Sequence, residues 1–429
     1  MREMKDSGIK WIGVIPSAWR TARVKNVAET MQSGGTPDSS NDTFYVDIEG
    51  GIPWVAITDM STTPYVKDTN KHISEEGRKS KNLIVFEPGT ILYAMYASVG
   101  KVSELAVPAT INQALLAIVL NSSIDGSFFK YALNAWEPYI ISESNGTTQF
   151  NLNANKVANL CFPMPNRLEQ ESIVRYLDTK CAQVDTLIAN VQFQIEKLKA
   201  YKQSMITEVV TKGLDPTVPM KDSGVEWIGE IPAYWKIQRG KALFKETEAR
   251  SADGSEELLT VSQYTGITPR SQKNVTMFEA LSLEGYKICE IGDIAANTMW
   301  LWAGAIGVSE YRGVVSPSYN VYRQRSNNFA PRYLDHLLRA PMLVQEYASR
   351  STGIRASRLR LYPKDFFNIM FPVPPLEEQQ AILDALNSKL SAVDRLIAIK
   401  QAKIEKLEQY KRSLIYEYVT GKREVSCDE

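Results

Sequence analysis

The sequence predicts an α+β protein with a pseudo-twofold tandem repeat, in which two globular domains are separated by two long helices that form an antiparallel coiled coil. Three observations lead to this prediction. A segment near the N-terminus returns in the middle of the chain, each half ends in a long heptad pattern, and each intervening region has strand-like runs followed by helical ones. Internal repeats of this kind constrain the whole fold.

The opening of the chain is repeated. Residues 4–19 (MKDSGIKWIGVIPSAW) and 220–235 (MKDSGVEWIGEIPAYW) are identical at eleven of sixteen positions, with an offset of 216. The ends of the two halves match as well, because residues 161–211 align with residues 370–420 at a constant offset of 209. The regions between align only loosely, although residues 82–95 resemble residues 286–299. The chain is therefore a duplication whose ends stayed alike while its middles diverged.

Both end segments are predicted to be long helices. Each follows a proline-rich stretch, has glutamates where its first turn begins, and stops at a glycine, Gly213 or Gly421. Lys202 and Lys411 interrupt the heptad seam at equivalent places, and such breaks lower stability but can fix register. An antiparallel pairing within one chain is expected, and the alternative is that each helix packs only on its own domain. The predicted seam residues are Leu177, Val184, Ile188, Ile195, Leu198, Leu386, Val393, Ile397, Ile404 and Leu407.

These boundaries predict four parts. Residues 1–160 and 214–369 form the two globular domains, each beginning with a copy of the repeated segment, and residues 161–213 and 370–429 form the helical spacers. Strand-like runs come first in each globular part and helical runs follow, which is typical of an α+β domain.

The composition argues against several classes of protein. The chain has 49 basic and 49 acidic residues, so it does not hold nucleic acid by bulk charge, and any basic surface is local. No run of eighteen apolar residues and no secretory signal is present, and the four cysteines are scattered, which together favour the cytoplasm. No phosphate loop, dinucleotide fingerprint or Asn-Pro-Pro-Tyr-like tetrapeptide occurs, and the two histidines lie far apart. The sequence does not predict an enzyme, a metal site or a catalytic residue.

Basic and amide-rich loops are the candidate DNA contacts. Residues 349–364 contain five basic side chains and no acidic one, and arginine both reads guanine and binds phosphate. The alternatives are a basic surface strand without a ligand, and, for the asparagine-rich loop of the first half, ordinary turns; two glutamates weaken the case for residues 72–82. The candidate residues are Arg350, Arg355, Arg358, Arg360 and Lys364 in the second half, and Arg78, Lys79, Lys81, Gln149, Asn151 and Asn153 in the first.

Four tryptophans stand in the duplicated openings: Trp11, Trp19, Trp227 and Trp235. Stacking on bases is conceivable, but their place in the shared frame favours packing against the long helices.

The repeated frame resembles the specificity subunit of type I restriction–modification systems. The resemblance rests on WIGVIPSAW and WIGEIPAYW, on SGGTP followed by GIPWVAITDM, on the PGTILYA and IGDI turns, and on the P-x-P…EQ-x-x-I openings of both helices. It covers essentially the whole chain. The second half departs from it by lacking SGGTP, and its most similar stretch is YTGITPR at residues 264–270.

The resemblance implies two target-recognition domains and no catalysis by this chain. It also implies a bipartite, asymmetric double-stranded DNA target and docking of two modification (methyltransferase) subunits that hold S-adenosylmethionine. Restriction subunits, which use ATP and Mg²⁺, would join the full complex in the cytoplasm of a bacterium or archaeon, next to the nucleoid. The main alternative is a stand-alone sequence-specific DNA-binding regulator, which the neutral net charge disfavours, and a coiled-coil scaffold without a DNA role is a further one.

Overall fold

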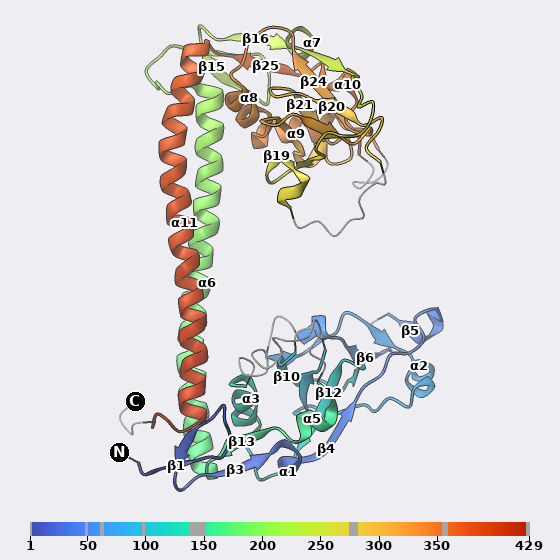
Figure 1. Cartoon of the computed structure of the whole chain (residues 1–429), viewed down its shortest axis with the longest axis vertical. Coiled ribbons are helices and arrows are strands. Elements are labelled where there is room, and N and C mark those ends of the chain that lie inside the picture. The colour runs from blue at the N-terminus through green and yellow to red at the C-terminus, as the bar shows by residue number, and fades with distance from the viewer. Residues whose placement is uncertain are drawn as a thin grey trace. The chain divides into compact units, whose positions relative to one another are not determined.

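The chain divides into two compact units (Figure 1). Unit 1 comprises Met1–Val191 with Ala402–Glu429, and unit 2 comprises Gln192–Gln401. The computed structural model describes residues 2–47, 50–60, 64–96, 99–136, 152–273, 282–353 and 359–425. No helix within these ranges is both long enough and apolar enough to cross a lipid bilayer.

Unit 1 begins with the repeated segment, in which β1 (Met4–Asp6) pairs antiparallel with β2 (Val14–Pro16). The next strand, β3 (Arg20–Arg23), pairs with β13 (Cys161–Met164) just before the first long helix. The range 161–213 that the sequence assigns to a helical spacer therefore opens with a strand. Proline at position 163 is tolerated there because β13 lies at the edge of a two-stranded sheet.

Two sheets form the body of unit 1. The five-stranded sheet has the order β4 (Ala28–Ser33), β12 (Leu115–Leu120), β9 (Ile91–Ala94), β10 (Val102–Leu105), β7 (Tyr65–Val66). The four-stranded sheet has the order β11 (Thr110–Ile111), β6 (Ile52–Val55), β8 (His72–Ile73), β5 (Tyr45–Val46). The short helices of this unit are α1 (Val24–Val27), α2 (Glu75–Ser80), α3 (Gly126–Asn134) and α5 (Ala154–Ala158), with 3₁₀ turns η1 (Asp42–Phe44) and η2 (Ile57–Met60).

The central strand β9 explains why this body is compact. All four of its residues are buried, and successive side chains point to opposite faces of a strand. Ile91 and Tyr93 join the core that contains α3 and the long helices, whereas Leu92 and Ala94 join a second core that includes Val55 of β6. A strand that is covered on both faces reads as a continuous apolar run, and the sequence ILYA fits that rule.

Unit 2 repeats this plan. Here β14 (Met220–Asp222) pairs with β15 (Glu230–Pro232), and β16 (Lys236–Arg239) pairs with β25 (Met370–Val373) before the second long helix, so the range 370–429 also opens with a strand. The main sheet has the order β17 (Phe244–Thr247), β24 (Asn320–Gln324), β21 (Ile294–Ala296), β22 (Ile306–Val308).

The remaining elements of unit 2 cover this sheet. Two further strand pairs are β18 (Leu259–Ser262) with β19 (Gly266–Pro269) and β20 (Lys287–Cys289) with β23 (Gly313–Val315). The helices are α7 (Gly240–Leu243), α8 (Pro331–Leu338), α9 (Pro341–Arg350) and α10 (Pro363–Phe366), with 3₁₀ turns η3 (Arg270–Gln272) and η4 (Leu301–Ala303).

The sheets show that the duplication runs through the diverged middles. The order β17-β24-β21-β22 in unit 2 is the order β4-β12-β9-β10 in unit 1, element for element. In the hairpins β9–β10 and β21–β22, the returning strand follows a glycine with positive φ, Gly100 at 93° and Gly304 at 88°. These glycines are 204 residues apart, the offset that also relates residues 82–95 to residues 286–299.

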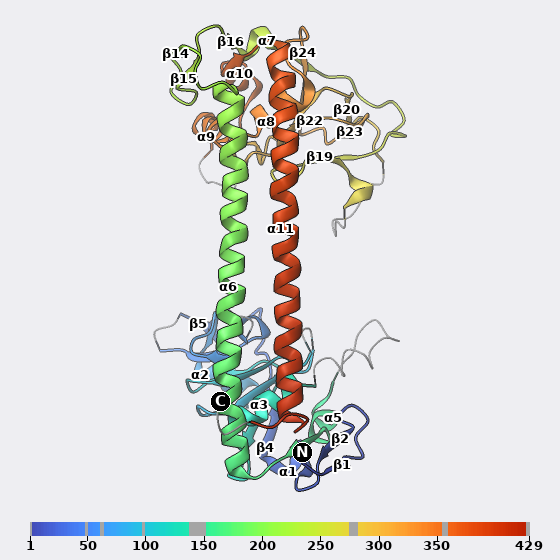
Figure 2. The same ribbon diagram turned by 90° about the vertical axis from the view of Figure 1, so that its left-hand side faces the viewer.

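The two long helices, α6 (Arg167–Lys212) and α11 (Leu376–Val419), pair antiparallel within each unit (Figure 2). In unit 1, Lys411 donates to Asp185 at 2.7 Å. In unit 2, Lys400 donates to Gln194 at 2.6 Å and Lys202 donates to Asp394 at 2.6 Å. Residue numbers fall along α11 as they rise along α6, so the predicted antiparallel coiled coil is confirmed and a helix that packs only on its own domain is excluded.

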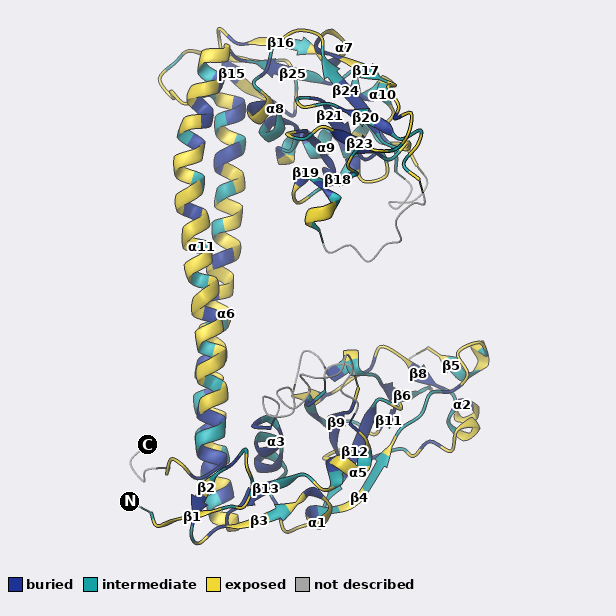
Figure 3. Cartoon of the chain, in the orientation of Figure 1, coloured by how far each residue is buried: buried dark blue, intermediate teal, exposed yellow. Residues whose placement is uncertain are grey.

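The predicted seam is the buried side of this pair (Figure 3). All ten predicted residues are buried or half-buried, and the fully buried ones are Leu177, Val184, Ile195, Leu386, Val393 and Ile404. The lysines that interrupt the seam direct their ammonium groups to aspartates of the partner helix, which keeps these charges paired.

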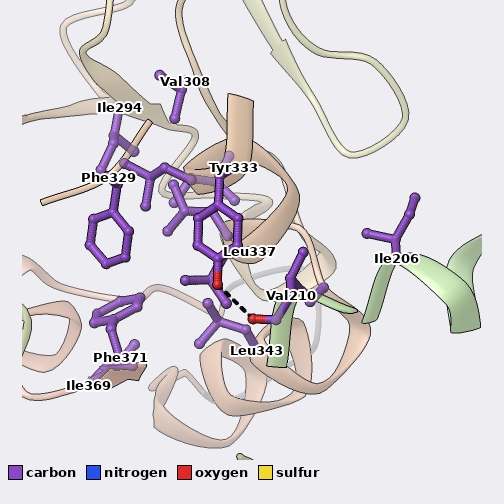
Figure 4. Close-up of a cluster of buried hydrophobic side chains, with 14 of the residues drawn as sticks. Ile206, Val210, Ile294, Val308, Phe329, Tyr333, Leu337, Leu343, Ile369 and Phe371 are labelled. Carbon is purple, nitrogen blue, oxygen red and sulfur yellow. Dashed lines mark hydrogen bonds between the residues drawn. The ribbon is translucent and has the colours of Figure 1, made fainter. Parts of the chain in front are cut away.

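Each globular part is joined to the helix pair by a continuous core. In unit 2, the phenol of Tyr333 on α8 is fully buried and donates to the carbonyl oxygen of Val210 on α6 at 2.8 Å (Figure 4). In unit 1, Tyr131 on α3 donates to Asp178 of α6 at 2.7 Å. The globular parts are therefore packed firmly on the helix segments of their own units.

Candidate DNA interface

The basic segment of unit 2 is partly organised. Arg350 ends α9, and its Nε donates to Oε1 of Glu346 at 2.6 Å. Thr352 and Arg360 exchange two backbone hydrogen bonds of 2.9 Å, which close the loop between them. Arg355 and Arg358 lie in that loop, outside the described residues. Lys364 is exposed on α10. Among the described candidates of this segment, Arg350 is paired with Glu346, and Lys364 is exposed.

The basic residues of unit 1 lie on and after α2, and one of them is already engaged. Arg78 donates to both carboxylate oxygens of Glu75, at 2.8 and 2.7 Å, and to the carbonyl oxygen of Leu83 at 2.9 Å. The hydrogen bonds from Arg78 lower the pKa of Glu75 to about 2. Lys79 and Lys81 are both exposed, but Lys79 lies 3.5 Å from the same carboxylate, whereas Lys81 has only a minor charge interaction with Asp38 among those described for it. Lys81 is therefore the stronger phosphate candidate of the three.

The amide-rich candidates divide in a similar way. Gln149 and Asn151 lie outside the described residues. Asn153 is the N-cap of α5, and its side-chain oxygen accepts from the backbone N–H of Lys156 at 2.8 Å. Capping is the ordinary use of asparagine at this position, so the turn interpretation accounts for Asn153.

The SGGTP loop follows β4 and is held rigidly. A side chain on Gly34 would overlap the carbonyl oxygen of Ile111, so this position requires glycine. Trp54 donates its indole N–H to the carbonyl oxygen of Gly35 at 2.9 Å, and Tyr45 donates to that of Pro37 at 2.9 Å. The TGITP stretch of unit 2 instead lies in β19, so the two stretches occupy different places in the repeated plan.

A small cavity lies beside the SGGTP loop. It has a volume of about 270 Å³ and is lined by residues 32–35, by residues 81–84, and by Phe86 and Ile111. Lys81 is thus one of the lining residues of a mixed polar and apolar pocket next to Gly34 and Gly35, and its charge makes it a candidate for contact with a phosphate.

The repeated tryptophans pack within the frame, as their place predicts: Trp227 is buried, and the half-buried Trp11 lies with its ring centroid 6.2 Å from that of Tyr416 on α11. Trp19 and Trp235 are buried, and each donates its indole N–H to a glutamate in the first turns of a long helix. The acceptors are Glu169 at 3.1 Å and Glu378 at 2.9 Å. Neither tryptophan is available for stacking on DNA.

The glutamine after each of these glutamates is the main contact that sequence reasoning missed. Gln170 accepts from the backbone N–H of Asp125, the N-cap of α3, at 2.7 Å. Gln379 accepts from the backbone N–H of Ala330, the N-cap of α8, at 2.8 Å. Both side chains are buried. The repeated Glu-Gln pair is visible in the sequence. Its partners, Asp125 and Ala330, are different residue types in the two units, so the sequence alone does not identify them.

Neither histidine is placed for catalysis. His72 is buried in β8, with Asp68 at 3.9 Å. His336 is half-buried on α8 and borders a cavity of about 450 Å³ together with Lys202, Asp335 and Asp394. Burial lowers the pKa of His336, and the charges of Arg339, Lys202 and Arg332 act in the same direction against that of Asp335. Within the described ranges, no cluster of His, Cys, Asp and Glu side chains is arranged to hold a metal ion.

The chain contains two α+β domains that pack in the same way on segments of an antiparallel helix pair but carry different exposed loops. This arrangement is that of a two-domain recognition protein. The family model described as "Type I restriction modification DNA specificity domain" matches the chain twice, over residues 16–197 and 236–409. The chain belongs to this family. Its role in DNA sequence recognition for a restriction–modification system, and its lack of a catalytic role, follow from this membership.

Individual relatives agree with the family. The chain is 24% identical to the MjaX type I restriction enzyme specificity subunit of Methanocaldococcus jannaschii, over 96% of this chain and 95% of the relative. It is 25% identical to the MjaVIII specificity subunit of the same organism, over 95% and 93% of the two chains. A chain from a solved structure described for complex assembly and conformational transition of the type I R-M system superposes with a TM-score of 0.64 at 16% identity, covering 95% of this chain and 99% of that one. This last likeness shows that the two chains share a fold.

Proposed function

We propose that the chain reads a bipartite, asymmetric double-stranded DNA target, with one half-site recognised by each unit, and positions methyltransferase subunits on it. One observation carries this proposal: the frame contacts are the same in both units, whereas the exposed loops differ. Trp19–Glu169 and Trp235–Glu378 are the same contact made twice. The SGGTP motif of unit 1 is absent from unit 2, and the arginine-rich segment of unit 2 stands, 209 residues further along, where unit 1 has its amide-rich loop. Two domains that attach to the helices through the same contacts but carry different loops would recognise two different half-sites.

The local basic segments support DNA as the ligand. The chain is neutral overall, so affinity must come from concentrated cations such as Lys81 in unit 1 and Arg360 and Lys364 in unit 2. A stand-alone DNA-binding regulator would need more of them, and family membership does not favour it.

Exposed apolar residues on the helix pair support docking of partner subunits. Leu187 and Tyr201 of α6 are exposed, and so are Leu396 and Tyr410 of α11, exactly 209 residues further along in both cases. Each of these residues directly precedes a seam position, so all four flank the seam. In an antiparallel pair, such flanking positions of the two helices face each other.

This geometry gives one apolar pair per unit. Leu187 and Tyr410 stand at the same level in unit 1, next to the Asp185–Lys411 ion pair, and Tyr201 and Leu396 stand together in unit 2, next to Lys202–Asp394. We infer that each pair docks one methyltransferase subunit, which gives two copies per chain. S-adenosylmethionine would belong to these subunits, and ATP and Mg²⁺ to the restriction subunits of the full complex. A complex of this kind would act on DNA in the cytoplasm.

Methylation mapping tests the recognition role. DNA from cells that carry this chain with its neighbouring methyltransferase subunit is sequenced by a single-molecule method that detects methylated adenine. The expected result is a two-part, asymmetric motif with a fixed gap, in which replacement of residues 236–369 by those of a relative changes one half only. A continuous motif, or no motif despite a functional methyltransferase, would contradict the proposal.

The gap tests the role of the helices. Removing residues 191–197 from α6 and 400–406 from α11 deletes one heptad from each at the same level. At 1.5 Å per residue this removes about 10 Å, or about three base pairs at 3.4 Å each. We expect a gap shorter by this amount with both half-sites unchanged, and an unchanged gap would refute the role of the helices as a spacer.

A further inference from the structure

The turn between β21 and β22 presents an aromatic surface that the proposed function has not used. Trp300 is 51% exposed and Met299 is 39% exposed, although both are large apolar residues. The Trp300 ring lies stacked on that of Trp302, with ring centroids 5.8 Å apart and planes inclined by 24°. We call residues 298–304 the tip of this hairpin.

The tip is rigid, so the exposure of Trp300 is not that of a loose loop. Leu301 is fully buried, and Trp302 donates its indole N–H to the carbonyl oxygen of Met299 at 3.0 Å. Asn297 accepts from the backbone N–H of Met299 at 3.1 Å and donates to the hydroxyl of Tyr319 at 3.0 Å. A rigid aromatic group loses little conformational entropy when it binds.

Unit 1 also has an exposed aromatic residue at the equivalent position. The equivalent hairpin turn, between β9 and β10, carries Tyr96, which is 36% exposed. The offset of 204 that relates Gly100 to Gly304 also relates Tyr96 to Trp300. The middles of the two units have diverged in most other respects, yet each hairpin keeps an exposed aromatic residue at this place.

Neighbouring charges indicate what the tip contacts. Helix α9 packs on η4 of the tip, and a side chain on Gly304 would lie 3.1 Å from Val344 of this helix. The same helix ends at Arg350, which is paired with Glu346 at 2.6 Å, and leads into residues 351–364, which contain four basic side chains and no acidic one. The tip itself is uncharged. An apolar aromatic surface beside a basic segment suits a ligand with stacked aromatic rings and a phosphate backbone.

We propose that Trp300 in unit 2 and Tyr96 in unit 1 are wedges that stack on bases of their half-sites in double-stranded DNA. This inference rests on the proposed function and extends it to individual contact residues. An aromatic face reaches a base in a duplex only at an opened step, so the wedge requires a local kink. Steps of pyrimidine followed by purine open most easily, and we expect one at the wedge position in each half-site.

Binding measurements on the full chain with its methyltransferase subunits test the wedge in unit 2. The probe is a labelled duplex that carries the mapped motif. We expect Trp300→Ala to weaken binding about 5- to 150-fold, because one base loses its stacking partner. The slope of log K against log salt should stay unchanged, because no phosphate contact is removed. Trp300→Phe should retain most of the affinity.

Ile291→Ala is the matched control. Ile291 is 70% exposed in the turn that precedes β21, whereas Trp300 lies in the turn that follows it. Equal affinities of the Trp300→Ala and Ile291→Ala complexes would overturn the inference. Loss of a methyltransferase subunit from the Trp300→Ala complex on size-exclusion chromatography would also overturn it, by assigning the tip to protein docking.

Fluorescence of 2-aminopurine reports the opened step. The base analogue is placed at successive positions of the half-site, and the wild-type complex should raise its fluorescence at one step, with no rise for Trp300→Ala. No rise at any position would refute the wedge. If the wild-type complex binds the mapped duplex no more tightly than an unrelated duplex, both the proposed function and this inference are refuted. Normal wild-type binding with an unaffected Trp300→Ala variant removes this inference alone.

Discussion

The strongest structural prediction concerns Gln379, which ties the start of α11 to the recognition domain of unit 2. Its side chain is fully buried and makes three hydrogen bonds. The amide oxygen accepts from the N–H of Ala330 at 2.8 Å, and the amide nitrogen donates to the carbonyl oxygens of Asn328 at 2.8 Å and Pro374 at 2.9 Å. Gln379→Ala would leave one donor and two acceptors without these partners, of which the Pro374 carbonyl is buried and the groups of Ala330 and Asn328 are half-buried.

The expected cost follows from this count. An unsatisfied buried group costs about 1–3 kcal/mol, and water entering the space left by the amide restores part of it, so we take about 1 kcal/mol for each group. Gln379→Ala should then lower the free energy of unfolding of unit 2 by about 3 kcal/mol. Gln170 makes two such bonds, to Asp125 and Pro165, and Gln170→Ala should lower that of unit 1 by about 2 kcal/mol.

Hydrogen exchange measured by mass spectrometry resolves the two units. In Gln379→Ala, amides at the start of α8 should exchange about 100-fold faster through local opening, while α3 in unit 1 is unaffected. Gln380→Ala is the control, because Gln380 is the next residue of α11, is exposed, and bonds only to Asp384 among the contacts described for it. Its effect should stay within about 0.5 kcal/mol. Equal effects of Gln379→Ala and Gln380→Ala would refute the proposed tie.

Three further predictions concern the seam, a histidine and a glycine. Lys202→Leu and Lys411→Leu should each raise the free energy of unfolding by about 1 kcal/mol, measured by urea denaturation, because an apolar side chain replaces a seam charge; a loss of stability would contradict this. Burial lowers the pKa of His336, so the unfolded state binds the proton first; the stability of unit 2 should fall as pH drops below about 6.5, and His336→Gln should remove that slope. Gly34→Ala should cost about 3 kcal/mol because its methyl group overlaps Ile111, whereas Gly126→Ala, which meets only a side chain at 3.9 Å, should be neutral by thermal melting.

Much of the frame could be predicted because it depends on periodic patterns. The seam positions follow from spacings of three and four residues, and the antiparallel pairing follows from duplication of one helix within one chain. The burial of Trp19 and Trp235 followed from their presence in both copies. In each case the signal was the same residue type at the same place twice.

The recognition domains could be predicted only in class. The sheet orders depend on pairings between strands far apart in the chain, and strands of two to six residues leave little periodicity to read. The engagement of Arg78 by Glu75 and of Asn153 in an N-cap also required coordinates, because the same residues on a free loop would be candidate DNA contacts. The tip aromatics were missed because the sequence alignment of residues 82–95 with 286–299 stops one residue before Tyr96 and Trp300, and because the exposure of these two side chains can be seen only in the structure.

The frame residues at the helix starts are the same in both units, whereas the residues of the exposed loops differ. The difference in their contacts explains this. Glu169, Gln170 and their counterparts contact backbone groups and buried indoles of the same chain, so any change leaves a buried polar atom unpaired. Exposed side chains of the loops, such as Lys81 and Lys364, have no such buried partners, so a change there should cost the fold little. After a duplication, the loops of the two units can therefore change independently and come to recognise two different half-sites. This requires that the contacts that hold the frame together lie outside these loops, at the helix starts. In both units the Glu-Gln pair stands at those starts, and the tips and basic segments stand on other elements.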